Sequence, residues 1–165
     1  MSKRVHIGVI GEQDARPEMR KLAEEVGREV ARRGGVLVCG GLGGVMEAAS
    51  RGAAAEGGTV VGILPGTRAD DANPYVTIPV VTGLGEARNV IVVRSSDALV
   101  AVGGGYGTLS EIAYALKLGV PVVGLHTWEL SRPGLEGDPI FRARDAVQAV
   151  EMAWEMAQRR SAAGA

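Results

Sequence analysis

The sequence predicts a single α/β domain over residues 1–165, built on a parallel sheet of about six strands with helices on both faces. Two observations predict this class. Short apolar runs rich in β-branched residues alternate with longer stretches of helical periodicity, which is typical of buried strands joined by crossover helices. In addition, 165 residues with 46% hydrophobic content are enough for one core and too few for two large ones.

Five apolar runs have the length and composition of strands buried on both faces. They occupy residues 5–10, 36–39, 59–64, 98–102 and 120–125. A sixth strand is expected at residues 75–81. This βαβ alternation favours a parallel sheet, whose strands are joined by right-handed crossovers.

The segments between the strands carry apolar residues at helical spacing. Pro17 suits the first position of the first of these helices. The expected helices are residues 17–33, 44–55, 84–95, 108–118 and 145–159. Two Gly- and Pro-containing stretches, 65–74 and 131–139, are expected to form surface loops.

Charge and cysteine content exclude several kinds of partner. The 18 Lys and Arg residues nearly cancel the 19 Asp and Glu residues, so no net positive field attracts nucleic acid. No apolar run approaches membrane-spanning length, and the N-terminal run is too short for a signal peptide. The lone Cys39 cannot form an internal disulfide, which suits a reducing compartment. We therefore expect a cytoplasmic protein without nucleic-acid or membrane partners.

Glycines follow the predicted strands, most densely in GGLGG at 40–44 and GGGYGT at 103–108. A glycine after a strand is often only a tight turn, but two such loops at one sheet edge favour a ligand, because ligands bind beyond the carboxyl ends of parallel strands. Free amides at a helix start suit a phosphate. The residues expected to bind it are Gly41, Gly43, Gly44, Gly104, Gly105, Gly107 and Thr108.

Several well-defined motifs are absent from the chain. There is no G-x-G-x-x-G after the first strand, no G-x-x-x-x-G-K-[ST] and no G-x-S-x-G, which disfavours NAD binding, P-loop chemistry and serine hydrolysis. His6 and His126 lie in or just after apolar runs, without Cys or carboxylate partners at metal-ligand spacing. We therefore expect no metal and no required cofactor.

Three segments carry a family resemblance: residues 40–53, 86–102 and 103–111. Together they resemble the Lonely Guy (LOG) family, long mislabelled as lysine decarboxylases, and its relatives, the molybdenum-cofactor carrier proteins. The resemblance covers roughly residues 5–125. Its most specific element is P-G-G-x-G-T-x-x-E, matched from Gly104 to Glu111 but with Gly103 in place of the proline. The resemblance implies a Rossmann-like fold.

The resemblance also implies an activity and a catalytic pair. LOG enzymes cleave the N-glycosidic bond of nucleoside 5′-monophosphates with an Arg and the motif Glu, which correspond to Arg88 and Glu111; the Lys that follows the Arg is replaced by Asn89. Such departures suit the carrier branch or a sister group. Three functions stay open: a phosphoribohydrolase, a non-catalytic carrier of molybdopterin, or a regulatory nucleotide sensor. The family analogy further suggests a homodimer or higher homo-oligomer.

Glu111 also has a purely structural explanation. Thr108 and Glu111 have the spacing of a capping box, S/T-x-x-E, in which the Glu side chain reaches back to the start of the helix. Such a cap stabilises a helix by about 1 kcal/mol. The family signature favours the catalytic role, and both roles are compatible.

Overall fold

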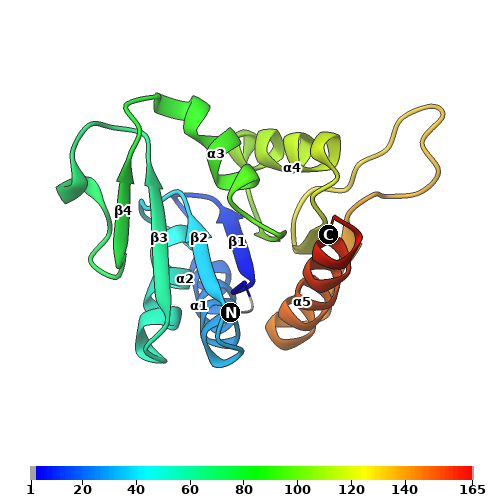
Figure 1. The fold of residues 1–165 in the computed structure, drawn as a ribbon. Coiled ribbons are helices and arrows are strands. Elements are labelled where there is room, and N and C mark those ends of the chain that lie inside the picture. The colour runs from blue at the N-terminus through cyan, green and yellow to red at the C-terminus, as the bar shows by residue number, and fades with distance from the viewer. Residues whose placement is uncertain (1–2, 165) are drawn as a thin grey trace.

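Strands and helices alternate along the chain in the computed structural model, which describes residues 3–164 (Figure 1). The strands are β1 (His6–Gly11), β2 (Val36–Cys39), β3 (Thr59–Leu64), β4 (Ile78–Val81), β5 (Ala98–Val102), β6 (Val122–Leu125) and β7 (Phe141–Arg142). The α-helices are α1 (Pro17–Arg32), α2 (Val45–Ala55), α3 (Asn89–Arg94), α4 (Tyr106–Leu118) and α5 (Ala146–Ala163). Two 3-10 helices complete the described part: η1 (Ala69–Asp71) and η2 (Gly85–Arg88).

All strands pair in parallel, in the order β4-β3-β2-β1-β5-β6-β7. The chain builds outward from β1 to β4, then returns to place β5 on the other side of β1. Strands β1 and β5 run in direct register, with Ile7 opposite Ala98 and Gly11 opposite Val102. The point between them is therefore the topological switch point of the sheet, where open α/β folds bind their ligands.

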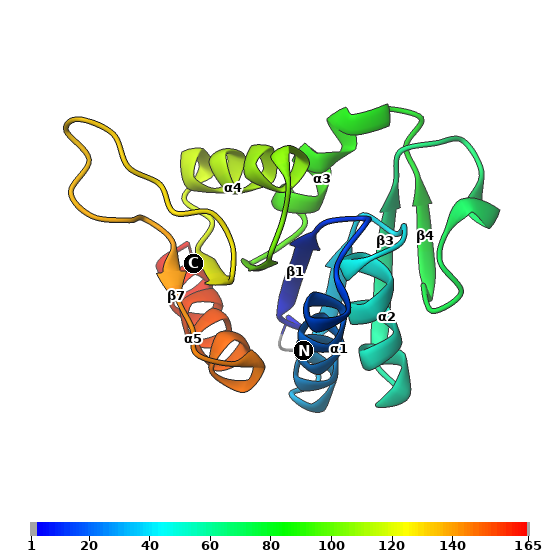
Figure 2. The same cartoon turned by 180° about the vertical axis from the view of Figure 1, so that it is seen from behind.

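Helices cover both faces of the sheet (Figures 1 and 2). Helices α1, α2 and α5 pack on one face and α3 and α4 on the other, and each layer has its own apolar cluster. Along β1, Ile7 and Val9 belong to the first cluster and Ile10 to the second, as the two-residue period of a strand requires. The predicted α/β class with helices on both faces is confirmed.

The structure differs from the expected elements at several boundaries. A seventh strand, β7, contains only two residues and carries no signal of its own. The helix expected at 84–95 is divided into η2 and α3, and the strand expected at 75–81 begins at Ile78. The last helix begins at Ala146, after Asp145, whose carboxylate accepts a hydrogen bond from the Gln148 amide as an N-cap.

Candidate functional site

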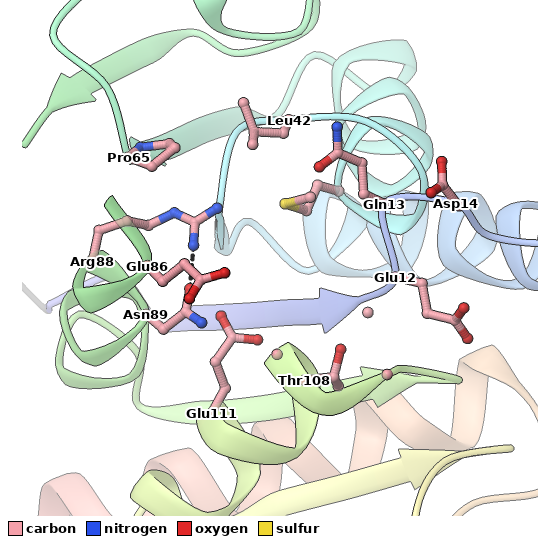
Figure 3. Close-up of a pocket in the computed structure, with 14 residues that line it drawn as sticks. Glu12, Gln13, Asp14, Leu42, Pro65, Glu86, Arg88, Asn89, Thr108 and Glu111 are labelled. Carbon is pink, nitrogen blue, oxygen red and sulfur yellow. Dashed lines mark hydrogen bonds between the residues drawn. The ribbon is translucent and has the colours of Figure 1, made fainter. Parts of the chain in front are cut away.

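A cavity of about 420 Å³ lies over the carboxyl ends of the central strands, at the switch point beside β1 (Figure 3). Segments from five connections meet there: those after β1, β2, β3 and β5, and the 3-10 helix η2 with the start of α3. The lining residues are Gly11, Glu12, Gln13, Asp14, Leu42, Met46, Pro65, Glu86, Arg88, Asn89, Gly105, Gly107, Thr108 and Glu111. The volume lies within the usual range of small-molecule sites.

The sequence-predicted site residues fall into two groups in the structure. Five of the nine line the cavity: Arg88, Glu111, Gly105, Gly107 and Thr108. The other four are not among the lining residues: Gly41, Gly43, Gly44 and Gly104. The tertiary structure thus brings the expected catalytic pair and the GGGYGT loop together, and it places the GGLGG loop mainly outside the cavity surface.

Helix α4 begins at Tyr106, two residues earlier than expected, with Gly105 as its N-cap. The capping-box interpretation is therefore wrong: no side chain caps this helix, and Thr108 and Glu111 lie inside its first two turns. The first amide bonded back along the helix start is that of Leu109, 3.0 Å from the Gly105 carbonyl. The three amides of residues 106–108 precede it, and they are the donors that a helix start offers to an anion.

Thr108 and Glu111 lie one turn apart on the face of α4 that lines the cavity (Figure 3). Their exposed fractions are 4% and 8%. Within residues 3–164, neither side chain makes a hydrogen bond or ion pair. Their oxygens are not sealed off, since Thr127 Oγ1 is the one fully buried side-chain oxygen or nitrogen without a partner among the described residues. A polar ligand in the cavity would therefore have access to both side chains.

Burial also governs the charge of Glu111. Removal from water raises the pKa of this carboxyl to about 8, and the nearby positive charge of Arg88 opposes the rise only in part. A carboxylic acid with this pKa keeps its proton at pH 7. Glu111 therefore enters the cavity as a neutral group that can donate as well as accept a hydrogen bond.

Arg88 ends η2 and is 9% exposed. Its Nε donates to the carbonyl oxygen of Ile63 at 2.9 Å, and its Nη1 donates to Oδ1 of Asn89. Burial lowers the pKa of the guanidinium, and the nearby Glu111 acts in the opposite direction. The guanidinium can lie close to the GGLGG loop because Gly40 has no side chain: a Cβ there would be 2.9 Å from Nη2.

The GGLGG loop shapes the wall around Arg88 and Leu42. Gly41 and Gly44 have φ of 77° and 64°, a region that favours glycine. A Cβ on Gly41 would lie 2.6 Å from Leu64, and one on Gly44 would lie 2.1 Å from the carbonyl of Glu12. These glycines are therefore explained by the path of the backbone.

The segment after β1 supplies three cavity residues that the sequence analysis missed: Glu12, Gln13 and Asp14. Glu86 of η2 was missed as well. The rule that directs attention to strand ends applies equally to the polar residues that follow Gly11. With Glu111, the cavity contains four carboxyl groups and one guanidinium.

Trp128 was also missed, and it supports the start of α4 from outside. Its Nε1 donates to the carbonyl oxygen of Gly105 at 3.1 Å. Tyr106 is 84% exposed and its ring centroid lies 5.7 Å from that of Trp128. Tyr106 does not line the cavity, so this aromatic pair is best understood as a brace for the glycine loop.

The part of the chain that the structure describes, residues 3–164, shows neither a metal centre nor a membrane-spanning helix. No cluster of three His, Cys, Asp or Glu side chains in that range is arranged to hold a metal ion. None of the helices described there is both long and apolar enough to cross a membrane.

The fold and the cavity define a Rossmann-like α/β protein whose site lies at the switch point of a parallel sheet. The chain belongs to the SLOG cluster4 family, whose model matches residues 4–157. A rice protein, the probable cytokinin riboside 5′-monophosphate phosphoribohydrolase LOGL9 of Oryza sativa subsp. japonica, is 38% identical over 104 residues. The match covers 59% of this chain and 44% of the rice protein.

Two solved structures are similar over nearly their whole length. The molybdenum cofactor binding protein from the phototrophic bacterium Rippkaea orientalis has a TM-score of 0.86 and 37% identity, covering 94% of this chain and 99% of that one. The Moco carrier protein from Chlamydomonas reinhardtii has a TM-score of 0.83 and 37% identity, covering 95% and 99%. The resemblance to the LOG family and its carrier branch is thereby confirmed.

Proposed function

We propose that this protein binds a phosphate-bearing pterin, of the molybdopterin type, or a related nucleotide, and holds it without consuming it. The observation that carries the proposal is the pair Thr108 and Glu111, both buried, both without a partner among the described residues, and both facing the cavity beside the free amides of α4. A phosphate at this helix start would accept from the amides and from the Thr108 hydroxyl.

The charge of Glu111 supports binding without cleavage. Breaking a glycosidic bond develops positive charge on the sugar, which a negative carboxylate near the anomeric carbon would stabilise. Glu111 has a pKa of about 8, so its carboxyl is neutral at pH 7 and lacks that negative charge. The protonated carboxyl instead suits a hydrogen bond to a ligand oxygen.

Asn89 supports the same conclusion. It stands where the LOG enzymes' Arg-Lys pair has its Lys, so one positive charge is missing beside the cavity. Its side-chain oxygen accepts a hydrogen bond from Arg88. Arg88 remains the single guanidinium in the cavity lining.

A second candidate, hydrolysis of nucleoside 5′-monophosphates, is favoured by one observation. Arg88 and Glu111 line the same cavity (Figure 3), as the family's catalytic pair would. A carboxyl that holds its proton at neutral pH is also suited to protonate a leaving base as a general acid. The two candidates therefore differ in whether the ligand leaves intact.

The first experiment identifies the ligand. The purified protein is denatured, and the released small molecules are identified by mass spectrometry. We expect an intact phosphate-bearing pterin or nucleotide, present in wild type and reduced in Gly107→Val. Recovery of no phosphate-bearing molecule from either protein, together with no binding of added AMP or inorganic phosphate, would contradict the proposal.

The second experiment separates binding from hydrolysis. AMP and related monophosphates are incubated with wild type, Asn89→Lys and Glu111→Gln, and free base is measured by chromatography. We expect no release of base by wild type. Brisk release that falls at least ~100-fold in Glu111→Gln, about 2.7 kcal/mol of transition-state stabilisation, would establish the hydrolase instead.

A further inference from the structure

Asn89 presents one side of its side-chain amide to the cavity. An arginine side chain has donors and no acceptor, so the oxygen of Asn89 must face Arg88, whose Nη1 donates to Oδ1. The nitrogen Nδ2 lies on the other side of the same planar amide (Figure 3), and it makes no hydrogen bond within residues 3–164. Because Asn89 lines the cavity, its N–H donors remain for a ligand.

Glu86 places an acceptor beside this donor. Glu86 and Asn89 are three positions apart across the junction of η2 and α3, and residues at this spacing in a helical segment lie on the same face. Both line the cavity (Figure 3). The Glu86 side chain is exposed, and among the residues that the structure describes it makes no hydrogen bond or ion pair. The cavity thus has a carboxylate acceptor next to an amide donor.

The two side chains lie apart from the start of α4. In Figure 3, Thr108 is on one side of Glu111, and Glu86 and Asn89 are on the other. The wall across the cavity from Glu111 carries the apolar side chain of Leu42, which suits the face of a planar ring. A ligand anchored by its phosphate at Thr108 would extend past Glu111, which brings the edge of its ring to the donor and the acceptor.

A donor beside an acceptor discriminates between ring edges. A lactam edge, as in guanine and hypoxanthine, has a carbonyl oxygen next to a ring N–H: the oxygen can accept from Asn89 while the N–H donates to Glu86. Adenine has an amino group in place of that oxygen and a ring nitrogen without hydrogen beside it. In the same position its amino group would meet the Asn89 donor, and its bare nitrogen would meet the Glu86 carboxylate. Both hydrogen bonds would then be lost.

We propose that Glu86 and Asn89 are specificity-determining residues, which recognise the edge of the ligand's ring and select a lactam edge over the amino edge of adenine. This inference rests on the proposed function, because the phosphate at α4 fixes where the ring lies. It gives the segment from η2 to α3 a task separate from phosphate binding, and it divides nucleotides with the same phosphate into two classes.

The probes are inosine 5′-monophosphate (IMP) and AMP, which share the ribose and the phosphate and differ only at this edge of the ring. Calorimetry on the full chain measures both affinities, with inorganic phosphate as a separate probe of the anion site. Asn89→Asp keeps an oxygen that accepts from Arg88 but turns the cavity-facing donor into an acceptor, and Glu86→Ala removes the acceptor. Glu25→Gln is the control, because it removes an exposed carboxylate of α1 outside the cavity lining.

In wild type we expect IMP to bind at least about tenfold more tightly than AMP, because the amino edge leaves two polar groups without partners. The preference should reverse in Asn89→Asp, shrink by at least about threefold in Glu86→Ala and stay unchanged in Glu25→Gln. The ratio of the two affinities is compared, because a change of charge affects both monophosphates alike.

Three results would overturn this inference while leaving the phosphate site in place. They are wild-type affinity for AMP equal to or above that for IMP, an unchanged preference in both variants, and binding of inorganic phosphate without either monophosphate. Absence of binding of all three probes to wild type would overturn the proposed function together with this inference.

Discussion

The guanidinium of Arg88 donates a hydrogen bond to the side-chain oxygen of Asn89, the residue next to it in sequence. This contact links the most notable departure from the LOG signature to the only guanidinium in the cavity lining. Asn89 therefore lacks the positive charge of the family's Lys, and its side chain holds the guanidinium of Arg88. The orientation of Arg88 is shared between this contact and the bond from its Nε to the Ile63 carbonyl.

We predict that Asn89→Leu lowers the free energy of unfolding by about 1 kcal/mol or more, because a buried guanidinium loses an acceptor. Phosphate affinity should fall as well, since Arg88 is no longer held toward the cavity. Asn89→Asp is the control, because it keeps the acceptor oxygen and should retain wild-type stability. Urea unfolding measures the stability of both variants. An Asn89→Leu variant as stable as wild type would show that Asn89 does not hold Arg88.

The second prediction concerns the proton on Glu111. The folded protein keeps this proton up to about pH 8, whereas the unfolded chain loses it above about 4.5. The folded state therefore binds more protons between these values, and its free energy of unfolding falls as pH rises through this window, by at most about 1.4 kcal/mol per pH unit. Below pH 4.5 both states are protonated, and above pH 8 neither is.

Glu111→Gln cannot titrate and should lack this loss. Its stability relative to wild type should rise by at least about 2 kcal/mol between pH 5 and pH 8.5, measured by urea unfolding at a series of pH values. Glu25→Gln, an exposed position on α1, is the control and should show no such trend. A parallel pH dependence of wild type and Glu111→Gln would mean that the Glu111 carboxyl is ionised in the folded protein.

The third prediction separates glycines that leave room for a ligand from glycines that the backbone requires. A Cβ on Gly107 would have no atom within 4 Å, whereas one on Gly104, at φ 118°, would lie 2.5 Å from Thr108. Gly107→Val should therefore fold normally and lose phosphate binding. Gly104→Ala should lose about 1–3 kcal/mol of stability.

Calorimetry with inorganic phosphate and urea unfolding test this pair of variants. Gly105→Val should behave like Gly107→Val, because a Cβ there also meets no atom within 4 Å. Full phosphate affinity in both Val variants would place the ligand elsewhere in the cavity. A Gly104→Ala variant as stable as wild type would contradict the backbone argument.

The fourth prediction concerns Asn73, which attaches the irregular segment after β3 to the GGLGG loop. Its Nδ2 donates to the Leu42 carbonyl at 3.0 Å and to the Ser50 hydroxyl at 3.3 Å, and its amide donates to the Gly41 carbonyl at 2.8 Å. Asn73→Ala should cost about 2 kcal/mol, because buried polar groups lose their partners.

The control for Asn73 is Asp70→Ala in the same segment. The Asp70 side chain is 89% exposed and lies 3.7 Å from that of Arg68, and such a surface pair contributes little. Urea unfolding should find Asp70→Ala within about 0.5 kcal/mol of wild type. Equal losses in the two variants would indicate a general effect of this segment rather than the anchoring role of Asn73.

The sequence by itself determined the class of the fold and most of its elements. Runs such as 36–39 and 59–64 were predicted with the observed bounds, because a strand buried on both faces must be apolar throughout. The strand-end rule and the signature from Gly104 to Glu111 both point to the edge of the sheet where the cavity lies. These are local patterns, and each can be read within one short segment.

Only the tertiary structure decided how these segments act on one another. The start of α4 at Tyr106 could not be read from a glycine-rich stretch, because glycine permits many backbone paths. The contact between Glu12 and Gly104 joins residues 92 positions apart, and no local pattern encodes it. The proton on Glu111 likewise depends on burial by distant segments: desolvation raises its pKa, and the sequence around it carries no signal of that burial.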